Sequence, residues 1–323
     1  MSFEFLVFSC GQLQHCDPFK GNLMLQKFDP RNKDILIYVN GELLPRDQAK
    51  VSVFDSVVQG GDAVWEGIRV YNGKVFALEE HLERLQYSAK AMALEGVPSS
   101  QDVRQALFKT LEANQMRNDT HVRLTLTRGE KITSGMNPRL NQKGCTLIIL
   151  AEWKPPIYQS MTLKLATSSI RRNSPQNLDS KIHHNNLINN ILAKIEANLC
   201  GVDDAIMLDM QGYVSETNAT NVFMVKNGVL YTPHADSCLP GITRKKVIEI
   251  AGKLKIQVVE KNLSVTEFYN ADEVFTTGTM GELAQVSEID GRMIENKGGQ
   301  HLLSKISKAF RELVSSQGEK LPF

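Results

Sequence analysis

The sequence predicts a mixed fold of α/β and α+β character, built as two domains. Short extended runs alternate with amphipathic helical patterns along the chain, and 323 residues are enough for roughly two domains. The apolar run at residues 146–150 is followed by Pro155-Pro156, a pair that ends regular structure. We therefore expect a boundary close to residue 155.

The boundaries follow from the same patterns. Little periodicity is visible before Ile35, where the first extended run begins. We expect an N-terminal extension over residues 1–34, a small α+β domain over 35–153, an interdomain linker over 154–160 and a large domain over 161–323.

Asn-Gly pairs indicate how the extended runs are joined. Both residues of such a pair tolerate positive φ, which makes the pair a strong hairpin signal. It occurs at Asn40-Gly41, Asn72-Gly73 and Asn227-Gly228. We expect a β-hairpin at each position.

Helical spacing of apolar residues appears in three stretches. Each is expected to bury one apolar face: Leu78, Leu82, Leu85, Ala89 and Met92 in the first; Ile188, Ile191, Leu192, Ile195 and Leu199 in the second; Val247, Ile248, Ala251 and Leu254 in the third.

The charge balance argues against two classes of partner. With 37 basic and 36 acidic side chains, the formal net charge is +1, so neither nucleic acid nor a membrane surface is expected as a partner. No apolar run of about 18 residues suggests a membrane span, and the N-terminus lacks a basic leader. The five cysteines are scattered and odd in number, which favours free thiols in a reducing, cytoplasmic compartment.

Common nucleotide, nucleophile and metal motifs are missing from the sequence. It contains no P-loop, GxGxxG, GxSxG or HExxH pattern, and we expect no metal site. His183 and His184 are adjacent, so on a helix they would point about 100° apart. We interpret them as ordinary histidines on a helix surface.

Six segments carry a recognisable pattern. Two lie in the first half, at residues 65–71 and 80–85, and four lie in the second, at 175–181, 213–223, 239–244 and 275–282. In this order and at this spacing, they resemble the fold-type IV pyridoxal-phosphate enzymes, which include branched-chain aminotransferases, D-amino-acid aminotransferases and aminodeoxychorismate lyases. The resemblance covers nearly the whole chain from Ile35 onward, and the branched-chain group is the most similar.

The resemblance implies pyridoxal 5′-phosphate as cofactor and Lys181 as its Schiff-base lysine. Such a lysine needs an amine that is neutral often enough to attack a carbonyl, which partial desolvation can provide. The freed Lys181 is then expected to move the proton between substrate and cofactor. Glu216 matches the acidic partner of the pyridine nitrogen. Taken alone, Lys181 would be a surface charge and Glu216 an exposed turn residue.

The cofactor phosphate is expected at a helix start. Gly241, Ile242 and Thr243 open a helix, whose free N–H groups and dipole favour an anion. The resemblance adds the Thr279 side chain and Arg84. Two alternatives remain open: an ordinary helix cap at Gly241, and a surface ion pair between Arg84 and Glu80, four residues earlier.

The substrate side is expected to use six residues. Strict alternation over residues 121–127 puts His121 and Arg123 on one face. The resemblance places both Arg123 and the loop at residues 135–138 near the substrate. The full set is Trp65, Arg69, His121, Arg123, Met280 and Gly281. Core packing is the alternative for Trp65 and His121, and Gly60, His121 and Asn186 depart from tyrosines of the branched-chain group.

The resemblance implies a homodimeric transaminase with ping-pong chemistry. We expect an amino group to move from an amino acid, with branched-chain L-amino acids favoured, to 2-oxoglutarate. A D-amino-acid or (R)-amine transaminase and an aminodeoxychorismate lyase stay open on the same fold. A non-catalytic binding protein would require a lost lysine or a broken phosphate site, and neither is seen. Residues 135–138 are expected to reach the partner subunit.

Overall fold

The first β-sheet comes mainly from the N-terminal half of the chain. The structure is a computed structural model that describes residues 26–156, 162–296 and 301–323. The neighbouring strands of this sheet all pair antiparallel. Their order is β16 (Glu319–Lys320), β4 (Lys74–Val75), β3 (Ala63–Tyr71), β5 (Thr120–Thr127), β6 (Thr146–Trp153), β1 (Leu36–Val39) and β2 (Glu42–Pro45).

Two long helices pack on this sheet. They are α2 (Leu78–Ala91) and α3 (Ser100–Ala113), and shorter turns are formed by α1 (Ser56–Gly60), η1 (Pro30–Asp34) and η2 (Pro138–Leu140). The apolar face predicted for the first helix is confirmed, because its leucines are buried in one core with β3 and β5. The buried members on α2 are Leu78, Leu82, Leu85 and Ala89.

All three predicted hairpins are present. Asn40, Asn72 and Asn227 have φ of 48°, 48° and 51°. Each lies between antiparallel strands: β1 and β2, β3 and β4, and β10 (Asn221–Lys226) and β11 (Val229–Thr232). The local preference of Asn-Gly for positive φ is therefore sufficient to locate these turns.

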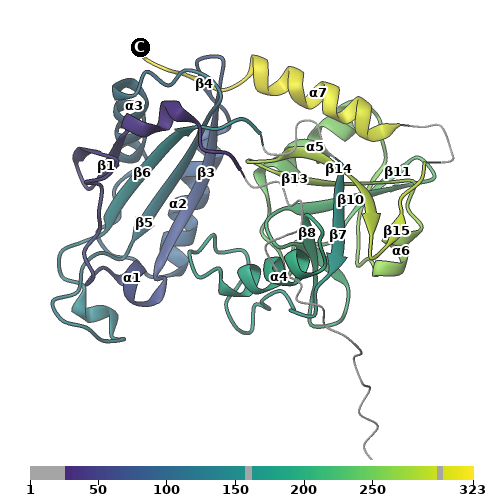
Figure 1. Cartoon of the computed structure of the whole chain (residues 1–323), viewed down its shortest axis with the longest axis horizontal. Coiled ribbons are helices and arrows are strands. Elements are labelled where there is room, and N and C mark those ends of the chain that lie inside the picture. The colour runs from purple at the N-terminus through teal and green to yellow at the C-terminus, as the bar shows by residue number, and fades with distance from the viewer. Residues whose placement is uncertain (1–25, 157–161, 297–300) are drawn as a thin grey trace, which may run out of the picture.

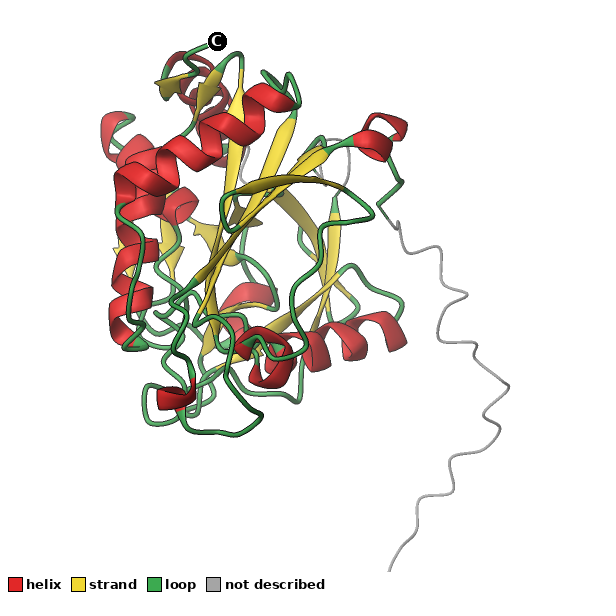
Figure 2. Cartoon of the chain, turned by 90° about the vertical axis from the view of Figure 1, so that its left-hand side faces the viewer, coloured by secondary structure: helices red, strands yellow, loops and turns green. Residues whose placement is uncertain are grey.

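The second sheet has mixed pairing. Its path runs β12 (Val258–Glu260), β11, β10, β13 (Glu273–Gly278), β14 (Glu282–Ile289), β7 (Leu163–Thr167), β8 (Asp204–Leu208) and β9 (Val214–Thr217), and β15 (Arg292–Met293) pairs with β14. The helices of this half are α4 (Ile188–Leu199), α5 (Ile242–Lys253), α6 (Val265–Tyr269) and α7 (Leu302–Ser316). In Figure 2 the helices lie around the outside of the strands.

The two sheets form two lobes that the C-terminal segment connects. Figure 1 shows the first sheet on the left, the second on the right, and α7 running along the top of the right-hand lobe. After α7, strand β16 pairs with β4, so the end of the chain returns to the first sheet. The two lobes are therefore not two uninterrupted stretches of sequence.

Two predicted helix faces are wrong in part. The α4 side chains expected to be buried are exposed, from 45% at Leu192 to 66% at Leu199. This helix packs through Ala193 and Ala197, because these small residues allow close approach to β8. Leu254 follows the last residue of α5 and is 42% exposed, whereas Val247 and Ala251 are buried as predicted.

The predicted extension and linker are described only in part. Residues 1–25 and 157–161 lie outside the described residues. Within the rest of the expected extension, Asn32 is buried, and its side chain bonds the backbone N–H and C=O of Trp153. This segment is therefore packed against β6. In the described parts of the chain, no helix is both long and apolar enough to cross a membrane.

Candidate active site

The start of α5 is shaped to receive an anion. Its N-cap is Gly241, no side chain caps the helix, and no acidic residue lies in its first turn. Ile242 and Thr243 line one pocket together with Gly278 and Thr279 at the end of β13, and Arg69 and His81 of the first half of the chain line the same pocket. The start of this 12-residue helix, where backbone N–H groups have no partner within the helix, and two threonines therefore line one small pocket.

Gly241 is required by a close neighbour. A Cβ at this position would overlap Oδ1 of Asn221. The Asn221 amide is held in place because its Nδ2 donates to Leu239 O at 2.9 Å and lies 3.3 Å from Glu216 Oε2. Asn221 therefore joins the start of α5 to Glu216, a connection that no local sequence signal indicated.

Arg84 lies beside the same helix start. Its Nη1 is 3.4 Å from Pro240 O, and its Nε and Nη2 donate to the Glu66 carboxylate at 2.8 and 2.7 Å. The alternative ion pair with Glu80 is wrong, because the Glu80 carboxylate accepts from Lys246 at 2.7 Å. Arg84 thus lies beside the loop that leads into α5.

Glu66 is a buried carboxylate with cationic and imidazole partners. Besides Arg84, it contacts His81 Nδ1 at 2.6 Å and His183 Nδ1 at 3.2 Å. Burial by itself would raise the pKa of Glu66, but the charge of Arg84 and the contact with His183 hold it well below 4.5. In the sequence Glu66 stands out only as part of a motif, because its partners are distant along the chain.

The interpretation of His183 and His184 as helix-surface residues is wrong. Both precede α4, and His184 is only 2% exposed. The His183 ring packs on Trp65 with 4.0 Å between ring centroids. Backbone bonds hold this segment against β3, with Trp65 N donating to His183 O at 2.9 Å and Asn185 N to Ala63 O at 2.8 Å. Tertiary contacts therefore prevent the helix from extending back to Lys181.

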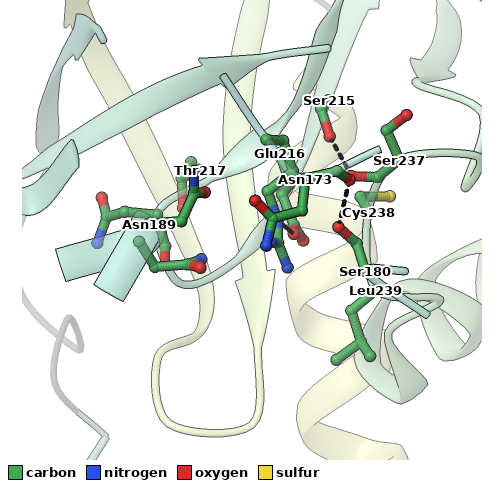
Figure 3. Close-up of polar contacts among 12 residues, drawn as sticks. Asn173, Ser180, Asn189, Ser215, Glu216, Thr217, Ser237, Cys238 and Leu239 are labelled. Carbon is green, nitrogen blue, oxygen red and sulfur yellow. Dashed lines mark hydrogen bonds and ion pairs between the residues drawn. The ribbon is translucent and has the colours of Figure 1, made fainter. Parts of the chain in front are cut away.

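Glu216 lies inside the second sheet rather than in an exposed turn. It belongs to β9, is 5% exposed, and accepts from Arg172 Nε at 2.6 Å. Burial raises the pKa of Glu216, and the Arg172 charge works in the opposite direction. Figure 3 shows Glu216 near Asn173 and Cys238, beside the hydrogen bond from Ser215 Oγ to Ser237 O.

Lys181 is exposed, so the expected partial desolvation is not found in this structure. Its Nζ lies 3.4 Å from Asp236 O, in the loop that leads to Gly241. The preceding residue, Ser180, is buried and donates to Asn173 O at 2.8 Å (Figure 3). The backbone at Lys181 is thus tied to the Glu216 region, while its side chain faces the loop before α5.

The predicted substrate residues of the first lobe share one face of the sheet. In the register of β3 with β5, Trp65 lies opposite Thr125 and Arg69 opposite His121. The Arg123 guanidinium lies 3.4 Å above the Trp65 ring centre. Burial lowers the pKa of Arg123 to about 10, although Glu66 opposes this shift.

Arg69 and His121 present buried nitrogens without partners. Arg69 donates from Nη2 to Lys154 O at 3.0 Å, but Nε and Nη1 have no hydrogen-bond partner among the described residues, and neither does His121 Nε2. Burial, followed by the charges of Arg69 and Lys154, lowers the pKa of His121 to about 3. Buried donors and acceptors of this kind are typically satisfied by a bound ligand or water.

The remaining predicted positions lie on other segments of the chain. Met280 and Gly281 form the turn between β13 and β14, directly after Thr279. Gly60 leaves open space, since a Cβ there would meet nothing within 4 Å. Asn186 is exposed, whereas its neighbour Asn185 accepts from Arg123 Nη2 at 3.3 Å.

Comparison with known proteins identifies the family. The family model described as "Amino-transferase class IV" matches residues 63–289, which include Lys181, Glu216 and the start of α5. The chain belongs to the class IV aminotransferases. The sequence-based resemblance to fold-type IV enzymes of the branched-chain group is therefore confirmed.

Three class IV aminotransferases similar to this chain illustrate its relationships. "Branched-chain-amino-acid aminotransferase-like protein 2" of Arabidopsis thaliana is 58% identical over 91% of this chain, which spans about half (53%) of that protein. The branched-chain-amino-acid aminotransferase of Pseudomonas aeruginosa is 32% identical over 89% of this chain and 95% of its own. A solved branched-chain amino acid aminotransferase, from the organism abbreviated T.th. and complexed with N-(5′-phosphopyridoxyl)-L-glutamate, has a TM-score of 0.82 at 33% identity, covering 88% and 95% of the two chains.

The residues present fit the family's phosphorylated cofactor. An uncapped helix start, the Thr243 and Thr279 side chains and the neighbouring Arg84 suit a phosphate, and the buried Glu216 suits a protonated ring nitrogen. Arg172 and Asn221 support Glu216 but carried no sequence signal. In the described ranges, no group of His, Cys, Asp and Glu is arranged to hold a metal ion.

Proposed function

We propose that the chain is a pyridoxal-phosphate-dependent transaminase that moves an amino group from branched-chain L-amino acids to 2-oxoglutarate by ping-pong chemistry. The observation that carries this proposal is the convergence of Arg84, Ile242, Thr243 and Thr279 around the start of α5. The name and ligand of the solved phosphopyridoxyl-glutamate complex support both the cofactor and a glutamate-derived partner acid.

Each cofactor-side residue has a distinct task in this proposal. When bound, the cofactor supplies an electron sink for the bond broken at the substrate Cα. Ile242, Thr243, Thr279 and Arg84 hold its phosphate, and Gly241 lets the backbone approach. Glu216 keeps a proton on the ring nitrogen, and Lys181 holds the cofactor covalently and then moves the substrate Cα proton.

The substrate carboxylate is assigned to the orphaned nitrogens of the first lobe. Arg69 and His121 are cross-strand neighbours and offer buried nitrogens to an anion. Met280 and Gly281 follow Thr279 in the turn after β13, and we assign their backbone N–H groups to the same carboxylate. In this proposal Trp65 and Arg123, which stack on each other, form one wall of the substrate pocket.

A spectral half-reaction tests the donor. L-leucine alone is expected to remove the visible absorbance of the bound cofactor and to release one equivalent of 2-oxo acid, because ping-pong chemistry needs no acceptor for this step. D-alanine and an aromatic (R)-amine serve as controls. Loss of absorbance with the controls alone would overturn the branched-chain assignment.

The exposed face of α4 supports a homodimer. Ile188, Ile191, Leu192, Ile195 and Leu199 form a continuous apolar stripe on a helix whose other face is packed. Met136, in the loop expected to reach the partner subunit, is 94% exposed. We expect sedimentation to give twice the chain mass and Ile191→Lys to shift it toward monomer. A fully active monomer would contradict the dimer.

We also propose a cytoplasmic location. Cys145, Cys200 and Cys238 are free thiols, as is usual in a reducing compartment. Cell fractionation tests this, and recovery from an oxidising compartment would overturn it.

A further inference from the structure

The Glu66 carboxylate is saturated with N–H donors. Arg84 Nε and His183 Nδ1 approach Oε1 at 2.8 and 3.2 Å, while Arg84 Nη2 and His81 Nδ1 approach Oε2 at 2.7 and 2.6 Å. An ionised carboxylate is an acceptor with about four lone-pair sites. All four are therefore used, and Oε1 is shared by Arg84 Nε and His183 Nδ1.

The proton on His183 can be placed from these contacts. Burial lowers the pKa of His183 to about 4 although Glu66 opposes it, so the ring is neutral at neutral pH and carries one N–H. Because ionised Glu66 only accepts, this proton lies on Nδ1 and points to Oε1. Arg84 Nη2, at 3.4 Å from the same nitrogen, then turns its protons to Glu66.

His183 is itself held from several directions. Its ring packs on Trp65, its backbone N–H donates to Ser88 Oγ at 3.1 Å, and its carbonyl accepts from Trp65 N at 2.9 Å. Ser88, Arg84 and His81 all belong to α2. The segment that begins at Lys181 is thus hydrogen-bonded to α2, the helix that carries Arg84.

We infer that His183 is a positioning residue for the phosphate site. Together with Glu66, it fixes the Arg84 guanidinium so that Nη1, the nitrogen not bonded to Glu66, faces Pro240 and the start of α5. The ligand served is a phosphate monoester. This inference rests on the proposed function, since it assigns the anion at α5 to the cofactor phosphate.

The test compares two ligands that differ only in the phosphate. Pyridoxal phosphate and pyridoxal are titrated into the cofactor-free protein, and absorbance gives both dissociation constants. His183→Leu should weaken pyridoxal phosphate binding by about tenfold or more, the size of one lost hydrogen bond to a charged group. Pyridoxal binding should change by less than about twofold.

Matched variants separate positioning from packing. His183→Asn can place an amide N–H where Nδ1 stands and should keep near-normal affinity, whereas His183→Gln should not. In an Arg84→Lys background, His183→Leu should weaken pyridoxal phosphate binding little further, since the guanidinium that His183 positions is absent. If His183→Leu does not fold, the comparison of Asn with Gln carries the test.

Two failures are distinguishable. Equal weakening of both ligands by His183→Leu, or equal affinities of the Asn and Gln variants, would overturn the positioning role. If the wild-type protein binds pyridoxal phosphate no better than pyridoxal, the proposed function fails instead.

Discussion

Replacing Lys181 with alanine is expected to abolish the visible absorbance of the bound cofactor and nearly all transamination. Alanine has no amine to link the cofactor or to move the substrate proton. The second role alone contributes about 10²–10⁴-fold in comparable enzymes, so activity should fall at least that far. Stability should change by no more than about 0.5 kcal/mol, because Lys181 is exposed.

Absorbance titration and urea unfolding together check this prediction. Lys253→Ala, which removes an exposed lysine from the last turn of α5, is the matched control and should keep the absorbance. An unaltered cofactor spectrum in Lys181→Ala would contradict the role proposed for this residue.

Glu216→Ala is expected to lower the free energy of unfolding by about 3–5 kcal/mol, in addition to its effect on cofactor chemistry. Glu216 and Arg172 are a buried ion pair with 2.6 Å between Oε1 and Nε. Removal of the carboxylate leaves Arg172 charged and buried, and its Nη1 already has no partner among the described residues. Urea unfolding of the cofactor-free protein measures this loss.

A double variant isolates the unpaired charge. Glu216→Ala combined with Arg172→Leu should be more stable than Glu216→Ala alone, since no buried charge is left without a partner. Simple addition of the two single losses would show that the pair contributes only packing.

Features set by local preferences can be predicted well from the sequence. The Asn-Gly hairpins depend on two residues that accept positive φ, and the start of α5 depends on Gly241 followed by a helical pattern. The face of α2 also follows from its own spacing, because one side of that helix is covered by a single sheet. In these cases the interacting residues are close together in the sequence.

Features set by distant contacts cannot be predicted in the same way. The partner of Arg84 is Glu66 rather than Glu80, which is nearer in the sequence. Glu66 is buried on β3, and among the described residues Arg84 is the Lys or Arg that pairs with it. The helix expected to include His183 begins only at Ile188, because β3 holds the His183 segment in a non-helical form. On α4 the small alanines face the sheet, so apolar spacing marked the exposed face. Each outcome depends on which element packs opposite, which spacing alone does not reveal.

Borohydride reduction followed by peptide mass mapping tests the central claim most directly. Reduction fixes the cofactor on the lysine that holds it, so the added mass identifies that residue without any substitution. We predict the added mass on the peptide that contains Lys181, at one cofactor per chain. Added mass on a different lysine, or none on the protein after incubation with pyridoxal phosphate, would contradict the account.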